Sequence, residues 1–233
     1  MQTITAESPD DLLHQLRAID IDVPPRGEGR TKQHTERWSI CRFLSTYADT
    51  PLLRYPLRID RGDRPDFQLT SDSMRVGIEH TEAVAADLAW ATAIQNRDQI
   101  DVSRMFHRVR AGDPRLSRSE VERIAHGEAT GDGWAGDSVE RDWSEVMAHF
   151  TRDKVERFAQ PGFAHLESNW LLVYDNWELP ALNQPKAARM FQSWFASDSI
   201  PFDQIFVECR SNIWQFGRAG HAYHSIVDLW DGD

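Results

Sequence analysis

The chain has 233 residues, a formal net charge of −11 and a sequence pI near 5.3, and 40% of its residues are hydrophobic. This length suits one domain with an insertion or a small appendage, and the hydrophobic content is sufficient for a packed core. The acidic balance argues against a generic nucleic-acid binder, because contacts to phosphates supply most non-specific affinity, although the distribution of charge matters more than its sum.

Several common features of exported and membrane proteins are not seen in the sequence. No apolar run approaches about 20 residues, so we expect no membrane span and no membrane partner. The first residues lack the basic and apolar regions of a signal peptide, which predicts a cytoplasmic protein. Cys41 and Cys209 each lie in an apolar segment, and we interpret them as buried thiols of a reducing compartment.

The N-terminal part of the chain predicts two helices. Ser8 and Pro9 are typical of a helix start, and residues 23–29 are rich in Pro and Gly, so residues 1–30 are expected to form a helix and a linker. A second helix is predicted from Thr31 to Ala48. Within it, Glu36 points near the buried side, where an acid is costly without a partner. From the residues alone, we interpret Glu36 as reaching solvent or pairing with Arg37 or with a strand arginine.

The next segment predicts strands that bring two acids together. After an expected strand over residues 52–59, Asp66 opens an alternating run, and Thr70-Ser71-Asp72-Ser73 has the composition of a turn. In residues 75–82, Gly77, Glu79 and Thr81 share one face of a strand. Antiparallel pairing places Asp66 and Glu79 at one end of the hairpin. Two close carboxylates repel each other, and a hard cation such as Mg²⁺ relieves that repulsion.

The remaining two thirds of the chain alternates between helices and strands. Residues 83–95 and 140–159 predict helices, separated by an insertion at about 97–139 that carries a short helix over 119–126. Lys154 falls on the apolar stripe of the 140–159 helix, one turn from Phe150 and one turn from Phe158, so it either snorkels to solvent or reaches a buried anion. Further elements are predicted as a strand over 169–174, a helix over 185–195, and strands over 202–208, 212–216 and 223–229.

This order of elements predicts an α/β (α+β) fold with a mixed central sheet flanked by helices. The Pro65-Asp66 pair followed by Glu79 resembles the motif of the PD-(D/E)XK nuclease superfamily, which has a restriction-endonuclease-like fold. The resemblance in element order covers residues 31–216 and implies an αβββαβ core, with residues 31–233 forming one nuclease-like domain.

The resemblance also implies a chemistry. Asp66 and Glu79 would hold Mg²⁺ or Mn²⁺, with the backbone carbonyl of His80 as a further ligand and Glu36 as an assisting acid. The His80 side chain alternates with Glu79 and should point away from it. The substrate would be nucleic acid, with DNA expected, and a homodimer would let each subunit cut one strand.

One position departs from the family pattern. The motif lysine should stand at position 81, which is Thr81 in this chain. Three possibilities follow. Lys154 supplies the lysine from its helix, His80 assists although its side chain should point away, or the site is degenerate. The sequence therefore predicts a metal-dependent phosphodiester hydrolase that uses Asp66, Glu79 and Lys154. The alternative is a catalytically degenerate member of the same fold that binds protein or nucleic acid.

Overall fold

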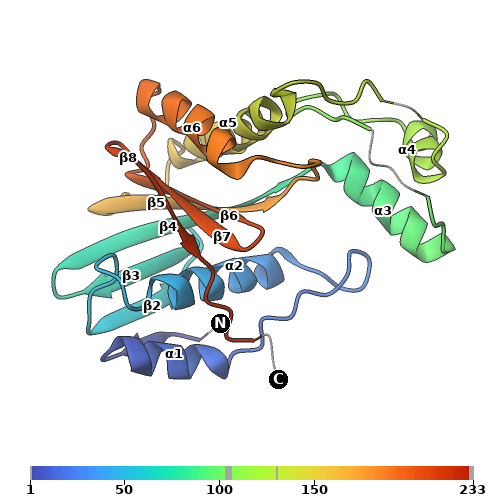
Figure 1. Cartoon of the computed structure of the whole chain (residues 1–233). Coiled ribbons are helices and arrows are strands. Elements are labelled where there is room, and N and C mark those ends of the chain that lie inside the picture. The colour runs from blue at the N-terminus through green and yellow to red at the C-terminus, as the bar shows by residue number, and fades with distance from the viewer. Residues whose placement is uncertain (1, 103–106, 130, 231–233) are drawn as a thin grey trace.

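A computed structural model describes residues 2–102, 107–129 and 131–230 of the chain. Within these residues the fold is mixed α/β, with six helices and one eight-stranded sheet whose strands lie in sequence order (Figure 1). The strands are β1 (Ile4–Ala6), β2 (Leu57–Arg61), β3 (Phe67–Ser71), β4 (Met74–Val84), β5 (Ser168–Asn176), β6 (Gln204–Cys209), β7 (Asn212–Gly217) and β8 (Gly220–Ser225).

The sheet combines two antiparallel halves through a parallel centre. Strands β1 to β4 form an antiparallel meander, β4, β5 and β6 run parallel, and β6 to β8 are antiparallel again. The mixed sheet predicted from the sequence is thus present. In the β3–β4 hairpin Phe67 is the partner of Ile78, so the residue before β3, Asp66, comes opposite Glu79.

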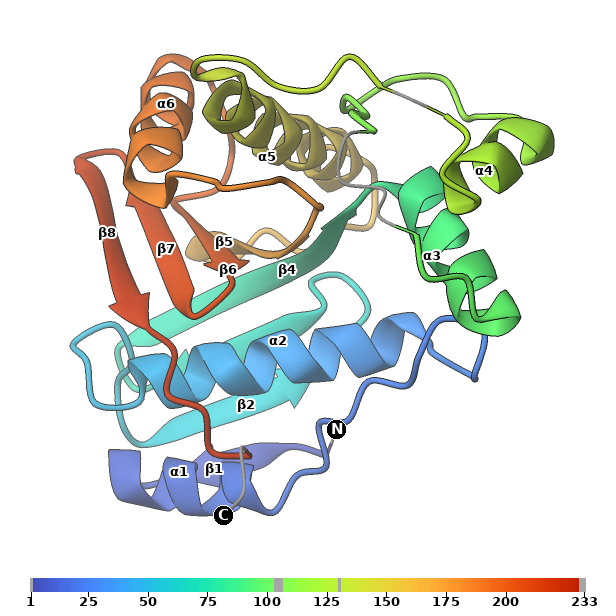
Figure 2. The same ribbon diagram turned by 45° about the vertical axis from the view of Figure 1, so that its right-hand side comes forward.

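Helices cover both faces of the sheet. Helices α1 (Pro9–Arg17) and α2 (Lys32–Tyr47) lie on one face, and α5 (Ser138–Phe158) and α6 (Gln184–Ser197) lie on the other (Figures 1 and 2). The first face buries a core that includes Leu12, Phe43 and Phe206. The second buries a separate core around Trp143 and Phe191. Burial of these apolar side chains holds the three layers together.

The N-terminal segment belongs to the first of these layers. Ser8 caps α1 by accepting a hydrogen bond from the amide of Asp11, which satisfies one of the free donors at the helix start. Strand β1 pairs with β2, and Leu12 and Leu16 are fully buried in the same core as α2. The short β1 was not predicted from the sequence.

Helices α3 (Ala86–Asp98) and α4 (Arg118–Ala125) project beyond the end of β4 (Figures 1 and 2). They pack against each other through a small core of their own, which includes Leu88, Ile94 and Ile124. The short helix predicted at 119–126 corresponds to α4. Ser117 and Glu120 form its capping box, since each side chain bonds the backbone of the other residue.

Two strand boundaries differ from the prediction. Strand β2 begins at Leu57 and not at residue 52, because Pro56 has no N–H to offer a neighbouring strand. The last strand is β8, at 220–225 and not 223–229. Beyond it the chain crosses α2, where the amide of Val227 donates to Thr46 Oγ1 and Ser45 Oγ donates to the Val227 carbonyl.

Two further predictions can be compared with the described residues. Cys41 and Cys209 are buried and free, as the sequence predicted. None of the helices in the described part of the chain is both long enough and apolar enough to cross a membrane.

Candidate functional site

The β3–β4 hairpin places two acids side by side in the interior. Asp66 is 6% exposed and Glu79 is 4% exposed. Asp66 lies just before β3, and its Oδ2 accepts a hydrogen bond of 2.8 Å from the backbone amide of His80. This bond joins the start of β3 to the middle of β4 and fixes the Asp66 carboxylate beside Glu79.

A lysine from another layer joins the two carboxylates. Lys154 lies on the buried side of α5 and is 6% exposed. Its Nζ donates to Glu79 Oε2 at 2.7 Å and lies 3.6 Å from Asp66 Oδ2. Of the two interpretations of Lys154 on an apolar stripe, the structure favours the one in which it reaches a buried anion. Asp66, Glu79 and Lys154 therefore converge from β3, β4 and α5.

Glu36 extends this network from the start of α2. It is 3% exposed, and its Oε1 lies 2.6 Å from Lys32 Nζ, while its Oε2 accepts from Arg61 at 3.2 Å. Lys32 Nζ also lies 2.9 Å from Asp66 Oδ1 and so bridges Glu36 and Asp66. Glu36 thus pairs with a strand arginine, as one interpretation predicted, and Lys32 links it to Asp66. Its role as an assisting acid of a metal site stays a prediction.

Lys32 was not predicted as a site residue. Its spacing of four residues from Glu36 on one helix was the available signal, but that spacing is common on solvated helix faces. Its side chain is 64% exposed even though its Nζ contacts two buried acids. Together with Lys154 and Arg61, Lys32 brings three positive charges to the three acids Asp66, Glu79 and Glu36, so the six ionised groups sum to zero.

Burial and neighbouring charges shift the two carboxylates in opposite directions. Burial alone would raise the pKa of Asp66, but Lys154, the His80 amide and Lys32 together hold its pKa below the usual value. The pKa of Glu79 is raised by burial and by the negative charge of Asp66, against the opposing effect of Lys154. Asp66 is thus the acid that stays ionised most firmly.

The His80 side chain lies on the opposite face of β4 from Glu79, as the strand alternation predicted. It is 1% exposed, and burial lowers the pKa of its imidazole to about 3, so the ring is neutral near pH 7. Its Nε2 has no hydrogen-bond partner among the described residues. The contact of His80 with the site is therefore its backbone amide.

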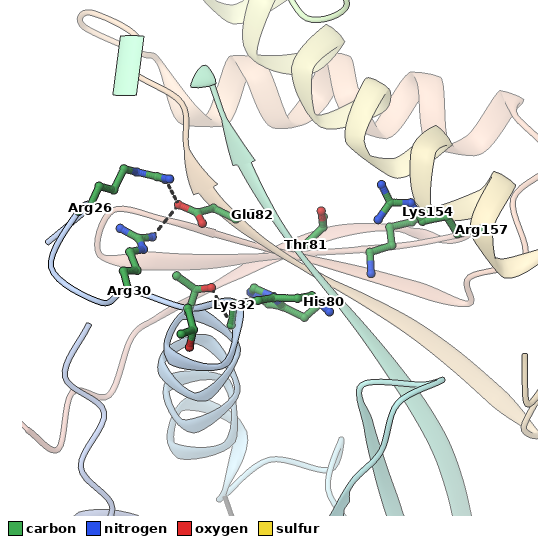
Figure 3. A pocket seen from close by; sticks show the side chains of 11 residues that line it. Arg26, Arg30, Lys32, His80, Thr81, Glu82, Lys154 and Arg157 are labelled. Carbon is green, nitrogen blue, oxygen red and sulfur yellow. Dashed lines mark hydrogen bonds and ion pairs between the residues drawn. The ribbon is translucent and has the colours of Figure 1, made fainter. Parts of the chain in front are cut away.

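A pocket of about 400 Å³ opens beside these residues. Its charged lining consists of five cations and one acid: Arg26, Arg30, Lys32, Lys154, Arg157 and Glu82. Figure 3 shows Lys154 and Arg157 on one side, with Arg26, Arg30 and Glu82 on the other. Arg26 and Arg30 both donate to Glu82 Oε1, at 2.6 and 2.7 Å. Together with the adjoining Arg61, Glu36, Asp66 and Glu79, the site has six cations and four acids. This excess of two positive charges, in a chain of net charge −11, favours an anionic ligand.

Thr81 also lines this pocket, on the same face of β4 as Glu79. The position that the family pattern gives to a lysine therefore opens onto the same space as Lys154. No sequence signal pointed to Arg26 and Arg30, which lie in the segment predicted as a linker.

The oxygen donors of Asp66 and Glu79 suit a hard divalent cation. Glu79 Oε1 is buried and has no hydrogen-bond partner in the described part of the chain, so one carboxylate oxygen is available to a ligand. No group of three or more His, Cys, Asp or Glu side chains among the described residues is arranged to hold a metal ion. Mg²⁺ is commonly bound by one or two carboxylates together with substrate phosphates, so two acids beside a cationic pocket fit it.

A second group of arginines, Arg108, Arg110, Arg115 and Arg118, does not line the pocket, and each of them pairs with a nearby acid. Arg108 pairs with Asp142, Arg115 with Asp87 and Arg118 with Glu122. Arg104 lies outside the described residues. This cluster therefore does not add to the cationic pocket.

We compared the chain with protein-family models, with curated proteins and with solved structures, and none of the three comparisons gave a match.

Proposed function

We propose that the chain is a metal-dependent phosphodiester hydrolase, a deoxyribonuclease with a restriction-endonuclease-like fold of the PD-(D/E)XK superfamily. The observation that carries the proposal is the convergence of Asp66, Glu79 and Lys154 beside a pocket with five cationic side chains. An acid pair with a buried lysine is the set that this chemistry uses, and the cations suit a phosphate-bearing substrate.

The arrangement of the sheet supports the fold assignment. The helix α2 is followed by the antiparallel strands β2, β3 and β4, then by α5 and the parallel strand β5. With α3 and α4 set aside, this order agrees with the αβββαβ core that the resemblance implies. Helix α3 corresponds to the helix predicted at 83–95, and α4 lies within the insertion predicted at about 97–139.

Each residue has a role in the proposed hydrolysis, in which water adds to phosphorus and one ester P–O bond breaks. A divalent cation held by Asp66 and Glu79 would polarise the phosphoryl oxygens and lower the pKa of water. Lys154 carries a fixed positive charge at the acids, where it can stabilise the negative charge that develops on the phosphate. Arg157 and Arg30 line the pocket and can hold phosphates of the bound strand.

A second candidate function is a catalytically inactive binding module with the same fold. The observation in its favour is that lysine ammonium groups already neutralise the acids, with Lys32 between Glu36 and Asp66, and Lys154 between Asp66 and Glu79. The substitution of the motif lysine by Thr81 points the same way.

Cleavage and metal binding distinguish the two candidates. The purified protein is incubated with supercoiled plasmid, single-stranded DNA or RNA in Mg²⁺ or Mn²⁺. The variants are Asp66→Asn and Lys154→Met, and Asp132→Asn is the matched control, because Asp132 is 57% exposed and pairs with Arg110 at the surface. Calorimetry measures the binding of the cation alone to each protein.

The hydrolase predicts metal-dependent cutting of DNA that is lost in Asp66→Asn and in Lys154→Met and kept in Asp132→Asn. Calorimetry should show cation binding that Asp66→Asn weakens. If no substrate is cut and no cation binds, the hydrolase is refuted and the binding module is supported.

A further inference from the structure

A second and larger hollow continues from the cationic pocket along α3. It has a volume of about 690 Å³ and lies between α3 and the segment at residues 25–30. Both hollows are lined by Arg26, Gly27 and Arg30, so they adjoin at these residues. We call the second hollow the α3 groove. Figure 2 shows α3 leaving the end of β4, with the segment before α2 near its far end.

Trp90 is the unusual residue of the α3 groove. The chain has nine tryptophans, all within the described residues, and Trp90 is the most exposed of them, at 38%. Its helical neighbours Ala86, Ala89 and Ala93 are small, so they leave the indole uncovered. Ala91, which does not line the groove, is buried in the core that α3 shares with α4. An indole ring that is partly open to solvent offers a flat face on which a planar ligand can stack.

Three arginines line the α3 groove. Arg26 and Arg30 line the cationic pocket as well, whereas Arg97, whose side chain is 71% exposed, pairs with its neighbour Asp98. Glu28 and Glu178 also line the groove, and Glu82 holds both Arg26 and Arg30, so the groove has no marked excess of charge of its own. Its distinguishing feature is an aromatic surface, Trp90, in a hollow that shares two arginines with the cationic pocket.

We infer that the α3 groove binds an unpaired nucleotide next to the phosphodiester bond that is cut, with its base stacked on Trp90 and its phosphate held by Arg26 and Arg30. This inference rests on the proposed function and adds a single-stranded substrate segment to it. Aromatic side chains next to cations bind single strands in this way, since every base has a flat face that can stack. A base within a duplex is already stacked on its neighbours and cannot use the indole.

The test measures the affinity for DNA under conditions that prevent cleavage. Fluorescein-labelled dT12 and a blunt DNA hairpin are titrated with the protein in EDTA, and binding is followed by fluorescence anisotropy. The variants are Trp90→Ala and Trp90→Phe. Tyr223→Ala is the matched control, because Tyr223 is another exposed aromatic residue, 59% exposed on β8, and lines neither hollow.

We expect Trp90→Ala to weaken the binding of dT12 by roughly 5- to 100-fold, and Trp90→Phe to retain most of the affinity. Tyr223→Ala should bind dT12 as the wild type does, and the duplex affinity of Trp90→Ala should be unchanged. Circular dichroism melts verify that each variant is folded.

The failure of this inference is distinct from that of the hydrolase. If Trp90→Ala binds dT12 as tightly as the wild type, or loses duplex and single-strand affinity equally, the groove assignment is overturned even when Asp66→Asn abolishes cleavage. If no substrate is cut but the Trp90→Ala loss is confined to dT12, the groove assignment stands as a binding site and the hydrolase falls.

Discussion

The buried ammonium of Lys154 gives a test of the site that is independent of any substrate. Its Nζ lies 2.7 Å from Glu79 Oε2 and 3.6 Å from Asp66 Oδ2. At an effective dielectric constant of about 20, these contacts give roughly 6 and 5 kcal/mol of gross attraction. The cost of removing the charges from water offsets most of it. Truncation of one partner of a buried ion pair typically costs about 3–5 kcal/mol, so we expect Lys154→Met to lower the free energy of unfolding by about that amount.

The assay is urea denaturation at neutral pH, with and without Mg²⁺. The loss in Lys154→Met should shrink when Glu79→Gln is added, since the second change removes the uncompensated acid. Mg²⁺ should stabilise Lys154→Met more than the wild type, because a cation replaces the missing charge. Lys186→Met is the control, because its ammonium is 3.8 Å from Glu140 and 38% of the side chain is exposed. The reasoning would be refuted if Lys154→Met had the same free energy of unfolding as the wild type. It would also be refuted if adding Glu79→Gln to Lys154→Met did not recover part of the lost stability.

Three further outcomes are expected. Adding Thr81→Lys to Lys154→Met should restore cleavage, because positions 81 and 154 line the same pocket. If the double variant is as inactive as Lys154→Met, Lys154 does not take the place of the motif lysine. Arg42→Met should lower the free energy of unfolding by about 3–5 kcal/mol, because it leaves Glu208 buried without the guanidinium 2.7 Å away; unchanged urea midpoints would count against this. Burial lowers the pKa of His80 from 6.5 to about 3 in the folded chain. As pH falls, the unfolded chain therefore binds a proton at this histidine before the folded chain does. Stability should therefore fall as pH drops from 6.5 toward 3, and fall less in His80→Leu; equal slopes in the two proteins contradict the assignment.

The sequence predicted the parts of the site that depend on strand alternation. The period of two along residues 75–82 put Glu79 and Thr81 on one face and the His80 side chain on the other, and the hairpin register brought Asp66 opposite Glu79. Lys154 was identifiable because a lysine on an apolar stripe must have a partner or an exit to solvent. Each of these features depends on residues that are close in sequence, so it can be predicted without knowing the tertiary structure.

The missing parts depend on distant contacts. Lys32 reads as an ordinary exposed lysine until the fold brings Asp66, 34 residues away, to its ammonium. Arg26 and Arg30 lie in a segment with no periodic pattern, and Glu82, which orders them, is 56 and 52 residues away. The same reason explains β1, since three residues give no periodic signal and the strand exists only through its pairing with β2.

The contacts that build the site join residues at very different separations along the chain. Asp66 and the His80 amide are 14 residues apart within one hairpin, whereas Lys154 and Glu79 are 75 residues apart. Loop closure over the longer separation costs more entropy, and such contacts slow folding. We therefore expect the hairpin to form before α5 docks. In the folded chain α5 both covers the second core and brings Lys154 to the two acids. Completion of the fold and assembly of the site are one event, and a chain in which α5 has not packed has no site.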